Sequence, residues 1–189
     1  FDELVEFEPG TTKEILRSVY TGYGRSGFNT EKQVTEISCH AKGVSVLFGK
    51  AATIIDVGGQ DSKAINIDDR GNVLKFAMND KCAAGTGRFL EVMARVLELD
   101  IEQFDPLSLQ ADAPSPISST CTVFAESEVI SLISKGERRE NIIAGIHLSV
   151  AARVASLAAR VGFASPTVMT GGVALNGGIV RALEQKLNL

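Results

Sequence analysis

A double glycine, Gly58 and Gly59, stands between two predicted strands and limits the folds that this chain can adopt. Residues 53–57 form a short apolar strand that runs into it. In a Rossmann site such a turn leads directly into a helix. Here residues 62–68 and 72–78 are both β-like and are joined by a hairpin-type turn. The pattern therefore predicts three consecutive antiparallel strands and excludes a Rossmann turn.

The other elements follow from hydrophobic periodicity and from glycine and proline breakers. Helices are expected at 11–20, at 31–48, at 85–98, from just after Cys121 to 135–136, at 141–161 and from about 176 onward. A strand is expected at 167–170 and a loop at 105–116. The helix at 141–161 is apolar on most of its circumference, so we expect it to be buried between other elements. Together these elements predict an α/β fold.

The composition argues against two classes of partner. The chain has 19 Lys and Arg against 23 Asp and Glu, a formal net charge of −4. A nucleic-acid or anionic-membrane binder needs a basic face. No apolar run approaches the roughly 20 residues that span a bilayer. We therefore expect a cytoplasmic protein without nucleic-acid or membrane partners, and a piece of a longer chain, because the sequence begins with Phe1 and ends inside a predicted helix.

The first chemical signal is the carboxylate that ends the strand before the double glycine. Asp56 could orient Mg²⁺ or an attacking water, since Mg²⁺ prefers a few oxygen ligands and keeps several waters. Gly58 and Gly59 would let the backbone approach a phosphate, and Asp61 or Lys63 would order the turn. The alternative is an ordinary hairpin in which the aspartate caps a turn.

A second glycine pair follows the predicted strand at 167–170. Gly171 and Gly172, with Val173 and Asn176 after them, form a wall against which an adenine or ribose could lie without side-chain obstruction. Taken alone, the pair is equally explained by close packing of a helix on a strand. Two such turns about a hundred residues apart are an uncommon pairing and indicate the nucleotide cleft of actin-like ATPases.

Three cysteines exclude a disulfide framework. Cys82 and Cys121 each precede a predicted helix, where free N–H groups and the helix dipole favour a thiolate. Two ligands are too few for an iron–sulfur cube, but a homodimer supplies four, so a [4Fe–4S] cluster at a subunit interface is our hypothesis. The alternative is that free cysteines are small buried hydrophobes, and we accept it for Cys39. His40 and His147 are given packing or surface roles.

Five segments then carry a resemblance to a known family. They are residues 55–63, 78–94, 117–136, 142–147 and 168–176. They closely resemble the ATP-dependent activators of 2-hydroxyacyl-CoA dehydratases, within the BcrA/BadF-type ATPases. The resemblance implies the actin-like fold of the acetate and sugar kinase, heat-shock chaperone and actin superfamily, built of RNase H-like domains. Residues 1–50 would be the end of an incomplete first domain, and residues 51–189 the second domain.

The resemblance also implies a function. A homodimer would hold one [4Fe–4S] cluster through Cys82 and Cys121, hydrolyse ATP with Mg²⁺, and pass one electron to a 2-hydroxyacyl-CoA dehydratase. Ferredoxin or flavodoxin would re-reduce it. We expect Asp56 and Gln60 to be catalytic, with Asp56 also at Mg²⁺. ATP or ADP would be bound by Gly58, Gly59, Gln60, Asp61, Lys63, Gly171, Gly172, Val173 and Asn176.

Three other functions remain open at this point. A small-molecule kinase on the same fold needs a substrate pocket with a general base near the γ-phosphate. The ATPase subunit of a benzoyl-CoA reductase-type enzyme would share the same motifs. The third is an interaction module switched by nucleotide binding, which would leave Cys82 and Cys121 without a function.

Overall fold

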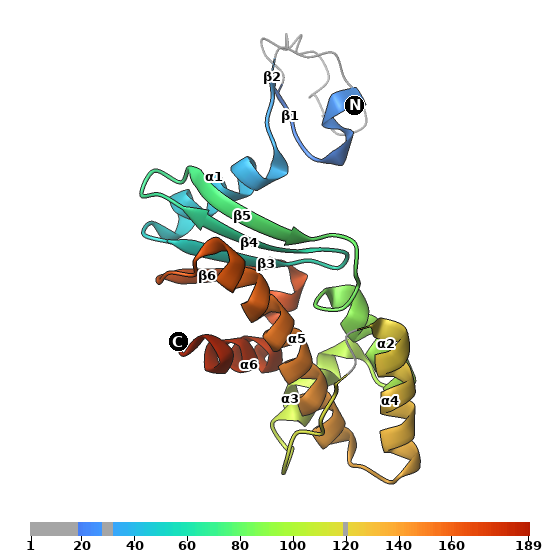
Figure 1. The fold of residues 1–189 in the computed structure, drawn as a ribbon. Helices are drawn as coiled ribbons and strands as arrows, with labels where there is room; N and C mark the ends of the chain where they lie inside the picture. Colours follow the sequence, from blue (N-terminus) through green and yellow to red (C-terminus); the bar gives the residue numbers. More distant parts are fainter. Residues whose placement is uncertain (1–18, 28–31, 119–120) are drawn as a thin grey trace, which may run out of the picture. The chain divides into compact units, whose positions relative to one another are not determined.

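The computed structural model describes residues 19–27, 32–118 and 121–189 (Figure 1). The chain divides into two compact units, residues 1–40 and 41–189. The domain roles expected for the two parts of the chain stay predictions.

The described part of the first unit is small. Its elements are β1 (Val19–Tyr20), the 3-10 helix η1 (Tyr23–Gly27) and β2 (Lys32–Gln33), and the two strands pair in parallel. Helix α1 (Glu36–Phe48) begins in this unit and continues into the second.

Both helices predicted near the N-terminus need correction. Residues 11–18 lie outside the described part of the chain, and residues 19–20 form β1 instead of a helix end. The helix expected from residue 31 begins only at Glu36. Thr35 explains the later start, because its Oγ1 accepts the N–H of Ser38 at 3.1 Å, as an N-cap side chain does.

The second unit is built on a four-stranded sheet. Its strands are β3 (Thr53–Val57), β4 (Ser62–Ile67), β5 (Val73–Asn79) and β6 (Thr167–Thr170), in the order β5-β4-β3-β6. The pairs β3–β4 and β4–β5 are antiparallel, which confirms the three predicted antiparallel strands. Strands β3 and β6 are parallel, so the two glycine turns that follow them lie at the same edge of the sheet.

Helices complete the unit. They are α2 (Gly87–Leu97), η2 (Ile101–Gln103), α3 (Phe104–Ser108), α4 (Thr122–Ser134), α5 (Arg139–Val161), η3 (Gly172–Leu175) and α6 (Gly177–Leu187). The loop predicted from residue 105 is wrong at its start, because α3 continues to Ser108. The fully buried ring of Phe104 anchors this short helix, and Pro106 falls in its first turn, where no N–H is needed.

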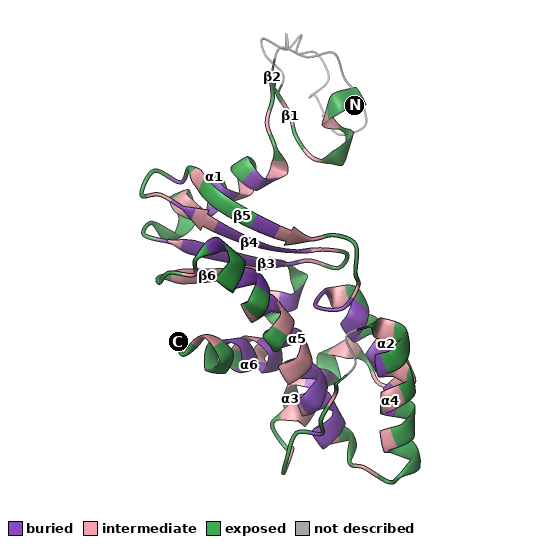
Figure 2. Cartoon of the chain, in the orientation of Figure 1, coloured by how far each residue is buried: buried purple, intermediate pink, exposed green. Residues whose placement is uncertain are grey.

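Helix α5 lies at the centre of the core. It packs on α6, β4 and β5, and twelve of its residues are buried, which confirms that prediction. Figure 2 shows the buried residues gathered along β3, β4 and α5. Contrary to our expectation from the apolar runs, α5 has the length and composition of a membrane span. A core helix buried among other elements has the same apolar composition, and α5 is buried in this way.

Candidate functional site

The two glycine turns predicted to bind a nucleotide lie side by side. Asp56 on β3 pairs in register with Thr170 on β6, and the Thr170 hydroxyl lies 3.1 Å from Asp56 Oδ1, to which it donates. Gly171 follows at once, with a φ of 85°. A Cβ there would lie 2.6 Å from the carbonyl carbon of Val57 and 2.8 Å from Asp56 Oδ1. Only glycine fits this crossing of the two strand ends.

A compact charge cluster stands beside the first turn. Lys63 Nζ lies 2.6 Å from Asp61 Oδ2 and 3.6 Å from Asp56 Oδ2. All three side chains are mostly buried, with 10%, 18% and 12% of the Lys63, Asp61 and Asp56 side chains exposed. Two carboxylates against one ammonium leave an excess negative charge in a protected place. Such a site suits a hydrated divalent cation.

The glycine turn itself is closed by its backbone. The N–H of Gly58 donates to the carbonyl of Asp61 at 2.9 Å. Gln60 lies at the tip and is exposed, and its side chain makes no hydrogen bond to another described residue. Its side chain is therefore placed only by the turn that carries it.

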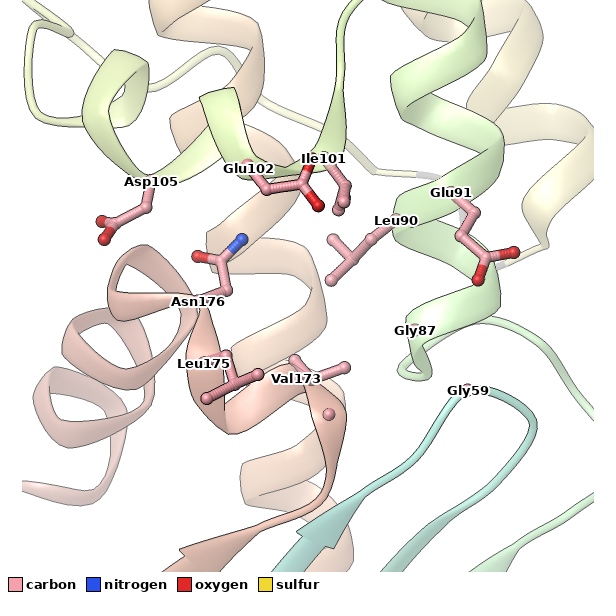
Figure 3. A pocket seen from close by; sticks show the side chains of 11 residues that line it. Gly59, Gly87, Leu90, Glu91, Ile101, Glu102, Asp105, Val173, Leu175 and Asn176 are labelled. Carbon is pink, nitrogen blue, oxygen red and sulfur yellow. The ribbon is translucent and has the colours of Figure 1, made fainter.

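A cavity of about 310 Å³ opens where the two turns meet α2 and η2 (Figure 3). Four of the residues predicted to contact the nucleotide line it: Gly59, Gly172, Val173 and Asn176. The other lining residues were not predicted from the sequence; they are Gly87, Leu90, Glu91, Ile101, Glu102, Asp105 and Leu175. The cavity combines an apolar wall with a few polar groups, as small-molecule sites do.

The first turn is bonded directly to α2. The N–H of Gly87 donates to the carbonyl of Gly58 and the N–H of Arg88 to that of Gly59, each at 2.8 Å. The first N–H groups of a helix have no partner within the helix, so the turn satisfies two of them. A Cβ on Gly87 would lie 3.1 Å from the Cα of Gly59, and the close approach thus requires glycine. A displacement of the turn must act on the start of α2.

All three cysteines are exposed. This contradicts the buried role expected for Cys39, whose thiol lies 3.5 Å from Thr21 Oγ1, close enough for a hydrogen bond. Cys121 is the N-cap of α4, as predicted, and its side chain makes no capping bond. Cys82 lies in a loop, five residues before Gly87, so it does not stand at a helix N-terminus. The predicted helix start was wrong because Gly85, with a φ of 87°, cannot continue a helix, and Thr86 is the N-cap.

Among the described residues, no three His, Cys, Asp or Glu side chains gather as a metal site.

His147 is buried on α5, and neither of its ring nitrogens has a hydrogen-bond partner among the described residues. Its ring lies near the ring of Phe104 and directly against Gly178 at the start of α6. Burial lowers the pKa of His147 from 6.5 to about 4. The carboxylate of Asp105 raises this pKa, and the guanidinium of Arg181 lowers it further. The packing role predicted for this histidine is confirmed by its burial.

The burial of His147 predicts an acid-sensitive stability. Between pH 6.5 and about 4 the unfolded chain binds a proton at this histidine that the folded chain excludes. The free energy of unfolding should therefore fall as the pH drops through this window, by up to about 3 kcal/mol. Denaturant titrations of His147→Phe should show a flatter pH dependence there. Val150→Ala, a buried change on the same helix, should lower stability but keep the wild-type slope.

The sequence is similar to a family profile and to proteins of known function. The sequence profile of the BadF/BadG/BcrA/BcrD ATPase family matches residues 7–188. The chain belongs to this family. It is also 58% identical, over 96% of its length, to the activator of lactoyl-CoA dehydratase from Anaerotignum propionicum, of which it covers 71%.

Two crystal structures of family proteins resemble the chain closely. The (R)-2-hydroxyglutaryl-CoA dehydratase component A of Acidaminococcus fermentans is 53% identical, with a TM-score of 0.85, over 90% of this chain and 66% of that one. The activator of the 2-hydroxyisocaproyl-CoA dehydratase from Clostridium difficile, with bound ADPNP, is 53% identical, with a TM-score of 0.83, over 90% of this chain and 64% of that one. The predicted actin-like ATPase fold is thereby confirmed.

Proposed function

We propose that this chain is part of an ATP-hydrolysing activator that delivers one electron to a 2-hydroxyacyl-CoA dehydratase. The observation that carries the proposal is the bonding of the Gly58–Gly59 turn to the start of α2, the helix that follows the Cys82 loop. A nucleotide site and a candidate metal ligand are thus neighbours in one short stretch of chain. The names of the three relatives described above support the dehydratase as the partner.

The nucleotide would occupy the cavity between the glycine turns. ADPNP in the Clostridium difficile relative supports ATP or ADP as the ligand. Gly59 and Gly172 would let the phosphates and ribose approach the backbone, and Val173 and Asn176 would face the nucleoside. Asp56 would orient Mg²⁺ or the attacking water from its buried position at the end of β3. Mg²⁺ would supply charge neutralisation at the phosphates.

Gln60, Asp61 and Lys63 would complete the phosphate side of the site. Gln60 stands at the exposed tip of the turn, where a side chain can reach a bound γ-phosphate or the water that attacks it. Asp61 closes the turn through its carbonyl, and Lys63 holds both carboxylates of the charge cluster. Gly58 and Gly171 would also contribute to phosphate binding, because their backbones bring the two turns together.

Cys82 and Cys121 fit an iron–sulfur cluster by the chemistry of their donors. Both thiols are exposed, and the Cys121 sulfur is free of any capping bond. Iron–sulfur cubes take four thiolates, so two chains related by a two-fold axis would complete the set. A bound [4Fe–4S] cluster supplies one-electron transfer at low potential.

The exposed face of α4 supports a homodimer. Val123, Phe124 and Ile130 on this helix are 66%, 67% and 53% exposed. Large apolar side chains gathered near a shared ligand are typical of a surface covered by another chain. A second copy of this chain would bury them and bring its own Cys82 and Cys121 to the same place.

The proposed function also includes a domain organisation and an electron donor. Residues 1–50 would be the C-terminal part of a first, incomplete actin-like domain, and residues 51–189 would form the second. Ferredoxin or flavodoxin would return the electron in the cytoplasm. The alternative of a small-molecule kinase needs a substrate-binding general base, and the cavity's carboxylates Glu91, Glu102 and Asp105 are the described candidates for it.

An anaerobic preparation of the whole protein tests the function. We expect a brown protein with four irons and four sulfides per dimer, the content of one [4Fe–4S] cluster. It should hydrolyse ATP without an added acceptor. A colourless, iron-free protein that hydrolyses ATP only when a sugar or an organic acid is added would contradict the activator and favour the kinase.

A further inference from the structure

The loop that carries Cys82 is fastened by a side chain of the sheet. Asn79, the last residue of β5, donates from Nδ2 to the carbonyl of Cys82 at 2.8 Å and to that of Ala84 at 3.1 Å. Since both partners are acceptors, the amide nitrogen and not the amide oxygen must face them. One amide group therefore holds two carbonyls of the loop.

A second side chain holds the carbonyl between these two. The hydroxyl of Thr86 donates to the carbonyl of Ala83 at 2.6 Å instead of capping α2. Three successive carbonyls of the loop, those of Cys82, Ala83 and Ala84, are thus bound by side chains at its two ends.

Because these three carbonyls are bound, the N–H groups of the same peptides point away from the bound side of the loop. In a trans peptide the N–H lies opposite the carbonyl. The N–H groups of Ala83, Ala84 and Gly85 belong to the peptides whose carbonyls are bound, and none of them has a hydrogen-bond acceptor among the described residues. Gly85 is left-handed, with a φ of 87°. Successive free N–H groups ending in such a residue resemble the nests that bind anions and iron–sulfur clusters.

We propose that Asn79 is a positioning residue for the metal centre at Cys82. It holds the loop so that the N–H groups of Ala83, Ala84 and Gly85 face the negatively charged group that Cys82 binds, and so helps to set its reduction potential. The inference rests on the proposed function, because it takes Cys82 to be a cluster ligand. It adds a residue outside the ligand and nucleotide sets.

Asn79 also joins the loop to the nucleotide side of the chain. Its backbone pairs in register with Ser62, the first residue of β4, directly after Asp61. The same residue thus contacts the strand that leaves the phosphate turn and the loop that carries the thiol.

Three variants of the whole protein test this role. Asn79→Ala removes the amide, and Asn79→Asp keeps its shape but sets a carboxylate against two carbonyl oxygens. Asn72→Ala is the matched control, because Asn72 Nδ2 also donates one bond at 2.9 Å, to Asp68, but at the opposite end of β5. In the metal-free chain, hydrogen exchange at Thr86 and Gly87, whose N–H groups donate to the carbonyls of Ala83 and Gly58, should become faster in both Asn79 variants and stay at the wild-type rate in the control.

The cluster-loaded proteins give the decisive readouts. With a chelator present, iron loss should be at least about tenfold faster in both Asn79 variants than in Asn72→Ala, as is typical for outer-shell groups. Their midpoint potentials should be more negative, since hydrogen bonds to sulfur stabilise the reduced state. Wild-type protein without iron would overturn the proposed function and this role with it. Iron-bearing wild type with unchanged iron loss and potential in both Asn79 variants would overturn this role alone.

Discussion

Asp56→Asn is expected to abolish ATP hydrolysis while leaving the iron content unchanged. The substitution removes the carboxylate charge at the end of β3 but keeps the side-chain shape. Lys63 retains its 2.6 Å pair with Asp61, so the turn should stay folded. The rate should fall by at least about a hundredfold, the usual loss when a positioned acid–base group is removed. Steady-state phosphate release measures it.

The matched control is Asp68→Asn. Asp68 lies in the hairpin at the other end of β4, where it accepts the N–H groups of Arg70 and Asn72. The same loss of charge there should leave the hydrolysis rate of the folded protein within about twofold of wild type, because surface changes away from the site have small effects. Wild-type turnover in Asp56→Asn would show that the Mg²⁺ site has been misplaced.

Gly171→Ala is expected to cause the largest loss of stability. Its Cβ would meet the Val57 carbonyl carbon at 2.6 Å, and its φ of 85° is unfavourable for alanine. With a ψ of 168°, this backbone conformation is one that essentially only glycine adopts, so strain of about 1–3 kcal/mol adds to overpacking of about 1–3 kcal/mol. The free energy of unfolding should therefore fall by about 3 kcal/mol, as urea titration would measure.

The neighbouring glycine provides the control. A Cβ on Gly172 would meet nothing within 4 Å, so Gly172→Ala should leave stability within about 0.5 kcal/mol of wild type. Because Gly172 lines the cavity, the added methyl group should instead weaken ATP binding. Equal stability losses in the two variants would contradict the strand-crossing geometry. Unchanged nucleotide affinity in Gly172→Ala would remove this wall from the binding site.

The sheet was predictable because its signals are local. Strand β3 is a short apolar run, and β4 and β5 are β-like segments on either side of a hairpin-type turn. The strand–turn–helix around Gly171 is equally visible in the local sequence. The pairing of β3 with β6, and the register that brings Thr170 to Asp56, were not predicted, because they depend on long-range contacts.

The parts that were missed depend on tertiary contacts. Helix α3 is short and holds a proline, and it forms because Phe104 is buried in the core. Glu102 and Asp105 reach the cavity only through that local fold. Sequence spacing does not show that Cys39 is exposed. It also does not show that Cys82 lies outside α2, because the left-handed Gly85 makes that helix begin later than predicted.

The proposed activator depends on a cluster that Cys82 and Cys121 hold together and that two chains share. Iron and sulfide content, measured with molecular mass on anaerobically prepared cysteine-to-serine variants, tests it most directly. We expect Cys82→Ser and Cys121→Ser each to lose the iron and most of the dimer, and Cys39→Ser to keep four irons per dimer, the content of one cluster. Four irons per dimer in either of the first two variants, or a full cluster in a monomeric wild type, would contradict the account.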